Sequence, residues 1–119
     1  MHFVLFDRIT GEQNPEVQKA RQRYDIRRIV SEDWETLGPK LLGKLHIVVG
    51  SEDTFHLEES TKILCDFLQS KGREDACEVV PKRTHFDLYQ PYATFPEGLA
   101  VRIDNEMKAA FEAGERKAP

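Results

Sequence analysis

The chain has 119 residues, enough for one modest domain and too few for two. Charged residues make up 32% of it, above the usual share of about a quarter, and hydrophobic residues 39%, so the apolar supply is thin for a self-sufficient core. The 17 basic and 21 acidic residues are mixed along the chain and give a net charge of −4. No basic face is offered to phosphate backbones or anionic lipid, so we expect neither nucleic acid nor a membrane surface as a partner.

Targeting signals are not evident. The segment Met1–Phe6 lacks the cationic start and the length of a signal peptide, and the longest apolar run is only a few residues. We expect a soluble chain with no signal or transmembrane segment, and its compartment is left undetermined.

The chain has two cysteines, Cys65 in a predicted helix and Cys77 in a predicted strand. Their separation does not match the spacing of metal ligands, so the sequence predicts two buried free thiols. We expect no metal and no cofactor.

Residues 1–43 are predicted to form an N-terminal arm and short helices. The apolar run Phe3–Phe6 leads into a polar turn. Asn14 is expected to cap the first helix, and Ser31 the last, which Gly38-Pro39 should end. The three predicted helices cover Pro15–Arg23, Asp25–Val30 and Glu32–Leu37.

Residues 44–90 read as a strand, a helix and a second strand. The first strand is Leu45–Val49, and the amphipathic helix covers about Leu57–Lys71. The second strand is Cys77–Val80, ended by Pro81. A unit of this kind predicts parallel strands joined by a right-handed crossover.

Residues 91–119 are predicted to form a last helix, from about Pro96 to Phe111, and a tail over Gly114–Pro119 that frays. Two parallel strands do not make a stable sheet in water and need further neighbours. The sequence therefore predicts a single, incomplete α/β domain over residues 1–119, with few parallel strands flanked by four or five helices.

An acid and a histidine follow the two predicted strands. Asp53 comes shortly after the first and His85 shortly after the second, at the sheet edge where open α/β proteins usually carry out their chemistry. Two plainer interpretations stay open: Asp53 caps the next helix while His85 is an ordinary loop residue, or Glu52 is the acid. A metal site that includes His56 is a weaker alternative, because the ligand spacing is not diagnostic.

Four segments together resemble the C-terminal part of esterases of the α/β-hydrolase fold: Leu5–Glu12, Asn14–Val17, Gly43–Phe55 and Val80–Phe86. The resemblance implies a mostly parallel sheet and hydrolysis of small carboxylic esters through an acyl-enzyme. It makes Asp53 the acid and His85 the base of a catalytic triad, in the family order of serine, acid and histidine. It also gives Phe55 a weak claim to a place near the substrate.

The nucleophile of that family is not found in this sequence. None of the four serines lies in a Gly-x-Ser-x-Gly elbow. We therefore expect a C-terminal fragment whose N-terminal half exists elsewhere or was lost. The alternative is a non-catalytic, truncated or interaction module that self-associates or pairs with another chain.

Overall fold

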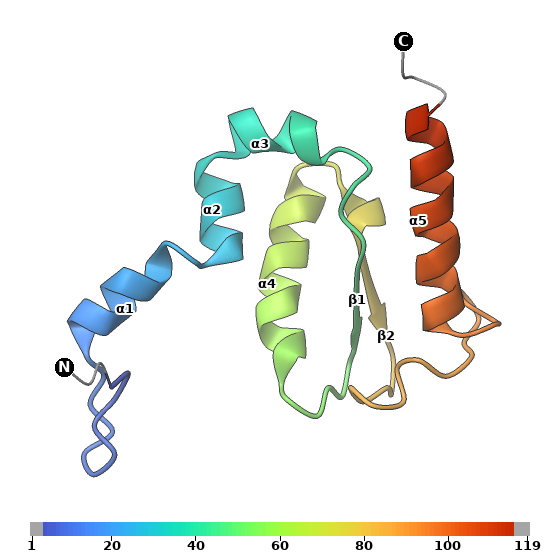
Figure 1. The fold of residues 1–119 in the computed structure, drawn as a ribbon. Coiled ribbons are helices and arrows are strands. Elements are labelled where there is room, and N and C mark those ends of the chain that lie inside the picture. Colours follow the sequence, from blue (N-terminus) through green and yellow to red (C-terminus); the bar gives the residue numbers. More distant parts are fainter. Residues whose placement is uncertain (1–3, 116–119) are drawn as a thin grey trace. The chain divides into compact units, whose positions relative to one another are not determined.

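A computed structural model describes residues 4–115 of the chain, with the side chain of Glu115 left out. Within these residues it has a mixed α/β fold of five α-helices and a two-stranded parallel sheet in the order β1-α4-β2 (Figure 1). Phe3 of the predicted arm and residues 116–119 of the predicted tail lie outside the described part. The elements are α1 Pro15–Gln22, α2 Ile26–Glu32, α3 Trp34–Leu41, β1 Ile47–Gly50, α4 Leu57–Ser70, a 3-10 turn Glu74–Ala76, β2 Cys77–Val80 and α5 Leu99–Glu115.

The contacts of the chain divide it into two compact units. One holds residues 4–46 together with Ile63–Ala76. The other holds Ile47–Lys62 and residues 77–115, so it contains both strands and α5. The helix α4 begins in this second unit and continues in the first.

The first unit starts with a polar turn and two capped helices. A bridge between Phe6 and Gln13 closes the turn, in which Asp7 accepts hydrogen bonds from two backbone N–H groups. Asn14 caps α1, as predicted, because its side-chain oxygen accepts from the first free N–H groups of the helix. Asp25 caps α2 in the same way, by accepting from the N–H of Arg28.

The prediction for the third helix was wrong at both ends. Ser31 lies inside α2, where its hydroxyl donates to the carbonyl of Arg28, and α3 continues through Gly38-Pro39. Pro39 falls in the last turn of α3, so its missing N–H removes one hydrogen bond near the end of the helix. Gly38 is buried and leaves room for the ring of Trp34, which a Cβ on Gly38 would meet at 2.8 Å.

The two strands pair in parallel, as predicted, with Ile47 opposite Cys77 and Gly50 opposite Val80. The strand β2 and the start of α4 match their predicted positions. However, β1 begins two residues later than predicted and includes Gly50, which was expected to end it. Glycine can continue a strand because its backbone still donates to and accepts from the ladder.

The core of the second unit lies between β2, α5 and the loop that joins them. Val80, Leu88, Phe95 and Leu99 are all buried and form one cluster, and Val48 of β1 packs against it. Since Leu88 belongs to the loop that carries His85, this cluster also anchors that loop.

The helix α5 begins at Leu99, three residues after its predicted start. Gly98 precedes it with a φ of 97°, a left-handed conformation that does not continue into a helix. The apolar residues along α5 are largely uncovered, since Ile103 is 40% exposed and both Met107 and Phe111 are 66% exposed.

Neither cysteine is a free thiol, contrary to the prediction. Both Cys65 and Cys77 are disulfide-bonded, and no free cysteine is found in residues 4–115. The prediction failed because disulfide formation depends on the approach of two residues in space, which their separation along the chain does not reveal.

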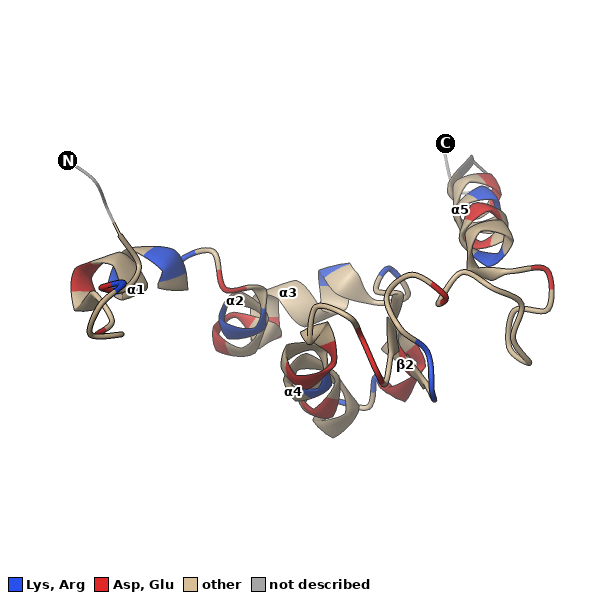
Figure 2. Cartoon of the chain, turned by 90° about the horizontal axis from the view of Figure 1, so that it is seen from below, with Lys and Arg blue, Asp and Glu red and all other residues tan. Residues whose placement is uncertain are grey.

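The charged residues are mixed on the helices as the composition indicates. Figure 2 shows residues of both signs on α1, α4 and α5. Among the helices of the described part, none is long and apolar enough to cross a membrane.

Candidate active site

Asp53 occupies the turn between β1 and α4, and its carboxylate is buried, with 1% of the side chain exposed. One carboxylate oxygen, Oδ1, accepts hydrogen bonds from the N–H groups of Phe55 at 2.8 Å and Leu57 at 3.4 Å. Leu57 is the first residue of α4, so Asp53 accepts from a free N–H group at the start of this helix, as the plainer interpretation expected. That role uses only one of its two oxygens.

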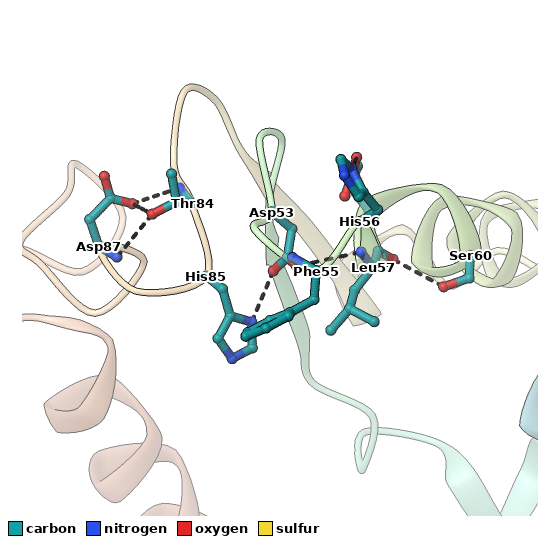
Figure 3. Close-up of polar contacts among 9 residues, drawn as sticks. Asp53, Phe55, His56, Leu57, Ser60, Thr84, His85 and Asp87 are labelled. Carbon is teal, nitrogen blue, oxygen red and sulfur yellow. Dashed lines mark hydrogen bonds and ion pairs between the residues drawn. The ribbon is translucent and has the colours of Figure 1, made fainter.

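The second oxygen of Asp53 contacts His85. The distance from Asp53 Oδ2 to His85 Nδ1 is 3.0 Å, and Figure 3 shows the imidazole ring meeting the carboxylate through this nitrogen. The ring's other nitrogen, Nε2, points away from Asp53 and has no hydrogen-bond partner among the residues that the structure describes. Because 42% of the His85 side chain is exposed, this nitrogen is open to a ligand.

Asp53 is ionised at neutral pH. Burial by itself raises the pKa of its carboxyl group, but the hydrogen bonds from Phe55, His85 and Leu57 outweigh burial and leave the pKa below its ordinary value. An ionised carboxylate can only accept hydrogen bonds, so Nδ1 of His85 must carry the shared proton. In the neutral ring, Nε2 is then the nitrogen that can accept a proton.

Backbone contacts hold the acid turn against the histidine loop. The N–H of Ser51 donates to the carbonyl of Val80 at 2.9 Å, and the N–H of Glu52 donates to the carbonyl of Arg83 at 3.0 Å. The Ser51 hydroxyl accepts from the N–H of Lys82 at 2.8 Å. These bonds continue the pairing of β1 and β2 by a few residues, and so set the separation of Asp53 and His85.

Gly50 is required for this close approach. A Cβ atom built on it would lie 2.1 Å from the carbonyl oxygen and 2.6 Å from the carbonyl carbon of Arg83. Both are backbone atoms that cannot turn aside as a flexible side chain would. Any other residue at position 50 would therefore move the histidine loop away from the acid turn.

The histidine loop is also held from within. Asp87 accepts two hydrogen bonds from Thr84, from its N–H at 2.6 Å and its hydroxyl at 2.9 Å, and these bonds lower the pKa of Asp87 (Figure 3). The guanidinium of Arg83 donates to the carbonyls of Asp87 at 3.2 Å and Pro91 at 2.9 Å. The loop that presents His85 is thus tied together on both sides of that residue.

Two aromatic rings stand next to the imidazole. The ring centroid of Phe55 lies 5.0 Å from that of His85, edge to face, and the centroid of Phe86 lies 5.8 Å from both. Phe55 is 57% exposed and Phe86 is 70% exposed. Sequence reasoning gave Phe55 a weak place near the substrate and did not single out Phe86.

The other candidates named from the sequence do not join this site. Glu52 is exposed, and its backbone rather than its side chain makes the contact with the histidine loop. The imidazole of His56 is 87% exposed and lies 3.7 Å from Glu58. In residues 4–115 no group of three or more His, Cys, Asp or Glu side chains is placed to hold a metal ion.

The hydroxyls of all four serines are engaged in hydrogen bonds within the described part of the chain. Ser51 accepts from Lys82, and the other three hydroxyls donate to carbonyls within their own helices. The structure brings Asp53 and His85 together but places no serine of this chain against Nε2.

Sequence reasoning missed Gly50, Ser51 and Arg83 as residues that position the pair. The only signal was the position of Gly50, directly at the end of a strand that precedes an acid.

Comparison of the chain with profiles of protein families, with curated proteins and with solved structures finds no match.

Proposed function

We propose that Asp53 and His85 are the acid and base of a carboxylic-ester hydrolase of the α/β-hydrolase type, whose serine nucleophile lies outside these 119 residues. The observation that carries the proposal is the 3.0 Å contact between a buried carboxylate and Nδ1 of an imidazole whose Nε2 is open. This is the arrangement that a general base needs, because the carboxylate fixes the tautomer and stabilises the imidazolium.

The proposed reaction proceeds through an acyl-enzyme. As a serine hydroxyl attacks the ester carbonyl, Nε2 of His85 takes its proton, and the resulting imidazolium is stabilised by Asp53. The imidazolium then gives that proton to the leaving alkoxide. In the second half, Nε2 takes a proton from water, which attacks the acyl-enzyme, and returns it to the serine oxygen.

The sheet supports the assignment to a larger α/β domain. It has two strands in the described part of the chain, and Val79 of β2 is 48% exposed. Parallel sheets are normally covered on both faces and have more than two strands. A sheet extended by further strands would bury such surface and bring a nucleophile to the same edge as Asp53 and His85.

Asp53→Asn tests the pairing directly. The amide NH₂ group that replaces the second oxygen can only donate, so Nδ1 must accept and the ring proton moves to Nε2. Nitrogen-15 NMR of the imidazole distinguishes the two tautomers. Asp87→Asn is the matched control, because this nearby carboxylate contacts Thr84 and should leave the tautomer unchanged. The same tautomer in wild type and Asp53→Asn would contradict the pairing.

A small alcohol can stand in for the serine hydroxyl to test general-base action. The 119-residue chain should speed acyl transfer from an activated ester to methanol, and His85→Ala should lower that rate by about tenfold. Organised sites gain roughly 10²–10⁴-fold from such catalysis, and a free alcohol loses the benefit of positioning. His56→Asn, at an exposed histidine, is the control. Equal losses in the two variants would refute the proposal.

The second candidate is a non-catalytic pairing module. It is favoured by the uncovered apolar face of α5, where Ile103, Met107 and Phe111 are exposed. If the face pairs with a second copy, the chain should self-associate at micromolar concentration in sedimentation experiments. Phe111→Glu should then give monomer, whereas Asn105→Glu, with the same charge change on α5, should not. A wild-type monomer at these concentrations would count against this candidate.

A further inference from the structure

The rings of Phe55, His85 and Phe86 form a three-membered cluster, which we call the aromatic cluster. All three pairs of rings meet edge to face, with centroids 5.0 to 5.8 Å apart. The three residues come from two different turns: Phe55 follows the acid, and Phe86 follows the histidine. The backbone contacts that pair Asp53 with His85 therefore also bring the two phenylalanines together.

The aromatic cluster leaves large apolar surfaces in water. Phe55 and Phe86 are more than half exposed, and neither belongs to the buried core around Val80. Each ring would gain free energy by contact with an apolar group, since burial of aromatic surface is favourable and ring–ring contacts add to it.

The cluster also contains one polar atom that has no hydrogen-bond partner in residues 4–115. Nε2 of His85 is free to accept a hydrogen bond, because the Asp53 carboxylate holds the ring proton on Nδ1. A ligand that matches this surface has a hydroxyl group that donates to Nε2 and an apolar ring or compact alkyl group directly beside that hydroxyl. The exposed Phe111 of α5 lies in no such cluster, because no ring contact of its side chain with an imidazole is found in the described residues.

We infer that Phe55 and Phe86 form the apolar side of a ligand-binding site. They contact an aromatic or compact apolar group of the ligand, next to the ligand oxygen that His85 contacts. The site takes small aromatic alcohols, and it takes their esters as substrates. The second statement rests on the proposed function, whereas the first rests on the aromatic cluster alone. Binding is therefore measured without turnover.

The test titrates the 119-residue chain with benzyl alcohol and follows its side-chain signals by NMR. We expect saturable shifts at Phe55, Phe86 and the His85 ring. Phe55→Ala and Phe86→Ala should each weaken binding by about three- to tenfold, the range expected for the loss of one aromatic contact. Phe86→Leu should lie between Phe86→Ala and wild type, because it keeps apolar surface.

Two controls separate the site from general stickiness. Phe111→Ala removes an equally exposed ring of α5 and should bind benzyl alcohol as wild type does. Methanol has the hydroxyl without the ring and should cause no saturable shift over the same concentration range. The nitrogen-15 signature of His85 in each variant reports whether the pair with Asp53 is intact.

The inference is overturned if neither phenylalanine substitution weakens binding, if Phe111→Ala weakens it equally, or if wild type shows no saturable shift. Failure of the proposed function gives a different pattern. If the wild-type chain binds benzyl alcohol but does not speed acyl transfer, the hydrolase assignment is wrong and the binding site remains. Acyl transfer to methanol with no binding of benzyl alcohol would remove only this inference.

Discussion

Gly50 is the residue on which the geometry of the site depends most directly. Asp53 and His85 supply the reactive groups, but they meet because the backbone at position 50 passes close to the carbonyl of Arg83. Ser51 and Glu52 then add hydrogen bonds to the histidine loop. The acid–histidine pair is thus built on a close approach of two backbones.

Gly50→Ala should therefore separate the pair. The added methyl group would lie 2.1 Å from a backbone oxygen, so the loop must shift. We expect the free energy of unfolding to fall by about 2 kcal/mol, within the range for overpacking a well-packed site. The His85 ring should also lose its fixed tautomer. Urea denaturation and imidazole NMR measure the two effects.

Gly114→Ala is the matched control for that substitution. Gly114 lies near the end of α5, and a Cβ there meets nothing within 4 Å. The change should raise the free energy of unfolding by up to about 1 kcal/mol, because alanine loses less backbone freedom in a helix. If Gly50→Ala behaved like Gly114→Ala, the close approach would not matter for the site.

At the scale of elements, α5 is held to β2 by charges as well as by the buried cluster. Arg102 of α5 donates to Glu78 of β2 and, at 2.7 Å, to Glu106 one turn further along α5. Glu78 also accepts from the Thr94 hydroxyl, so the strand, the helix and the loop between them meet at one carboxylate.

Arg102→Met should loosen α5 while keeping the apolar stem of the side chain. We expect a loss of about 1 to 2 kcal/mol in the free energy of unfolding, near the lower end for hydrogen bonds between charged groups, because Arg102 and Glu78 are 25% and 24% exposed. The rate of amide hydrogen exchange in α5 should also rise in this variant. Lys108→Met, on the same helix, is the control, and an equal effect there would contradict the role of the ion pair.

The elements show where sequence patterns succeed. Capping by Asn14, the amphipathic α4 and the β-branched strand β2 were predicted because local residues decide them. The end of α3 was not, because Trp34 packs on Gly38 and the helix runs through a proline. The start of α5 was also misplaced, because it depends on the backbone conformation of Gly98.

At the scale of the whole molecule, stability should depend on acidic pH through four carboxylates. The pKa values of Asp7, Asp53, Glu78 and Asp87 are all lowered in the folded protein. At Asp53 and Glu78 the hydrogen bonds outweigh burial, whereas the largest cause is hydrogen bonding from Thr10 at Asp7 and from Thr84 at Asp87. The unfolded chain therefore binds more protons than the folded one at acidic pH, so stability rises with pH in this range.

Thermal or urea unfolding as a function of pH measures this dependence. The contribution is fully present above the ordinary pKa values of 3.8 for Asp and 4.5 for Glu, and it is lost as the pH falls through the lower folded values. The contribution of these carboxylates should be constant above about pH 5.5 and decline below it. In Asp53→Asn the free energy of unfolding should fall less steeply as the pH is lowered. An unchanged slope of stability against pH in that variant would contradict the role of Asp53.

The sequence by itself determined the residue types and their order. Local patterns predict the order strand, acid, helix, strand and histidine. Parallel strands place their carboxyl ends at the same edge of a sheet, so the sequence was enough to predict that Asp53 and His85 lie close together. The scarcity of apolar residues likewise indicated a small core, and the exposed face of α5 is consistent with it.

Only the tertiary structure decided the rest. Asp53 uses one oxygen at the start of α4 and the other at His85, and Gly50 passes close to Arg83. Phe55 contacts Phe86, and both cysteines are disulfide-bonded. Each of these features joins residues that are separated in the sequence or depends on how a side chain is oriented. Local patterns report which backbone conformation a segment prefers. They do not report distances between segments, which packing of the whole chain sets.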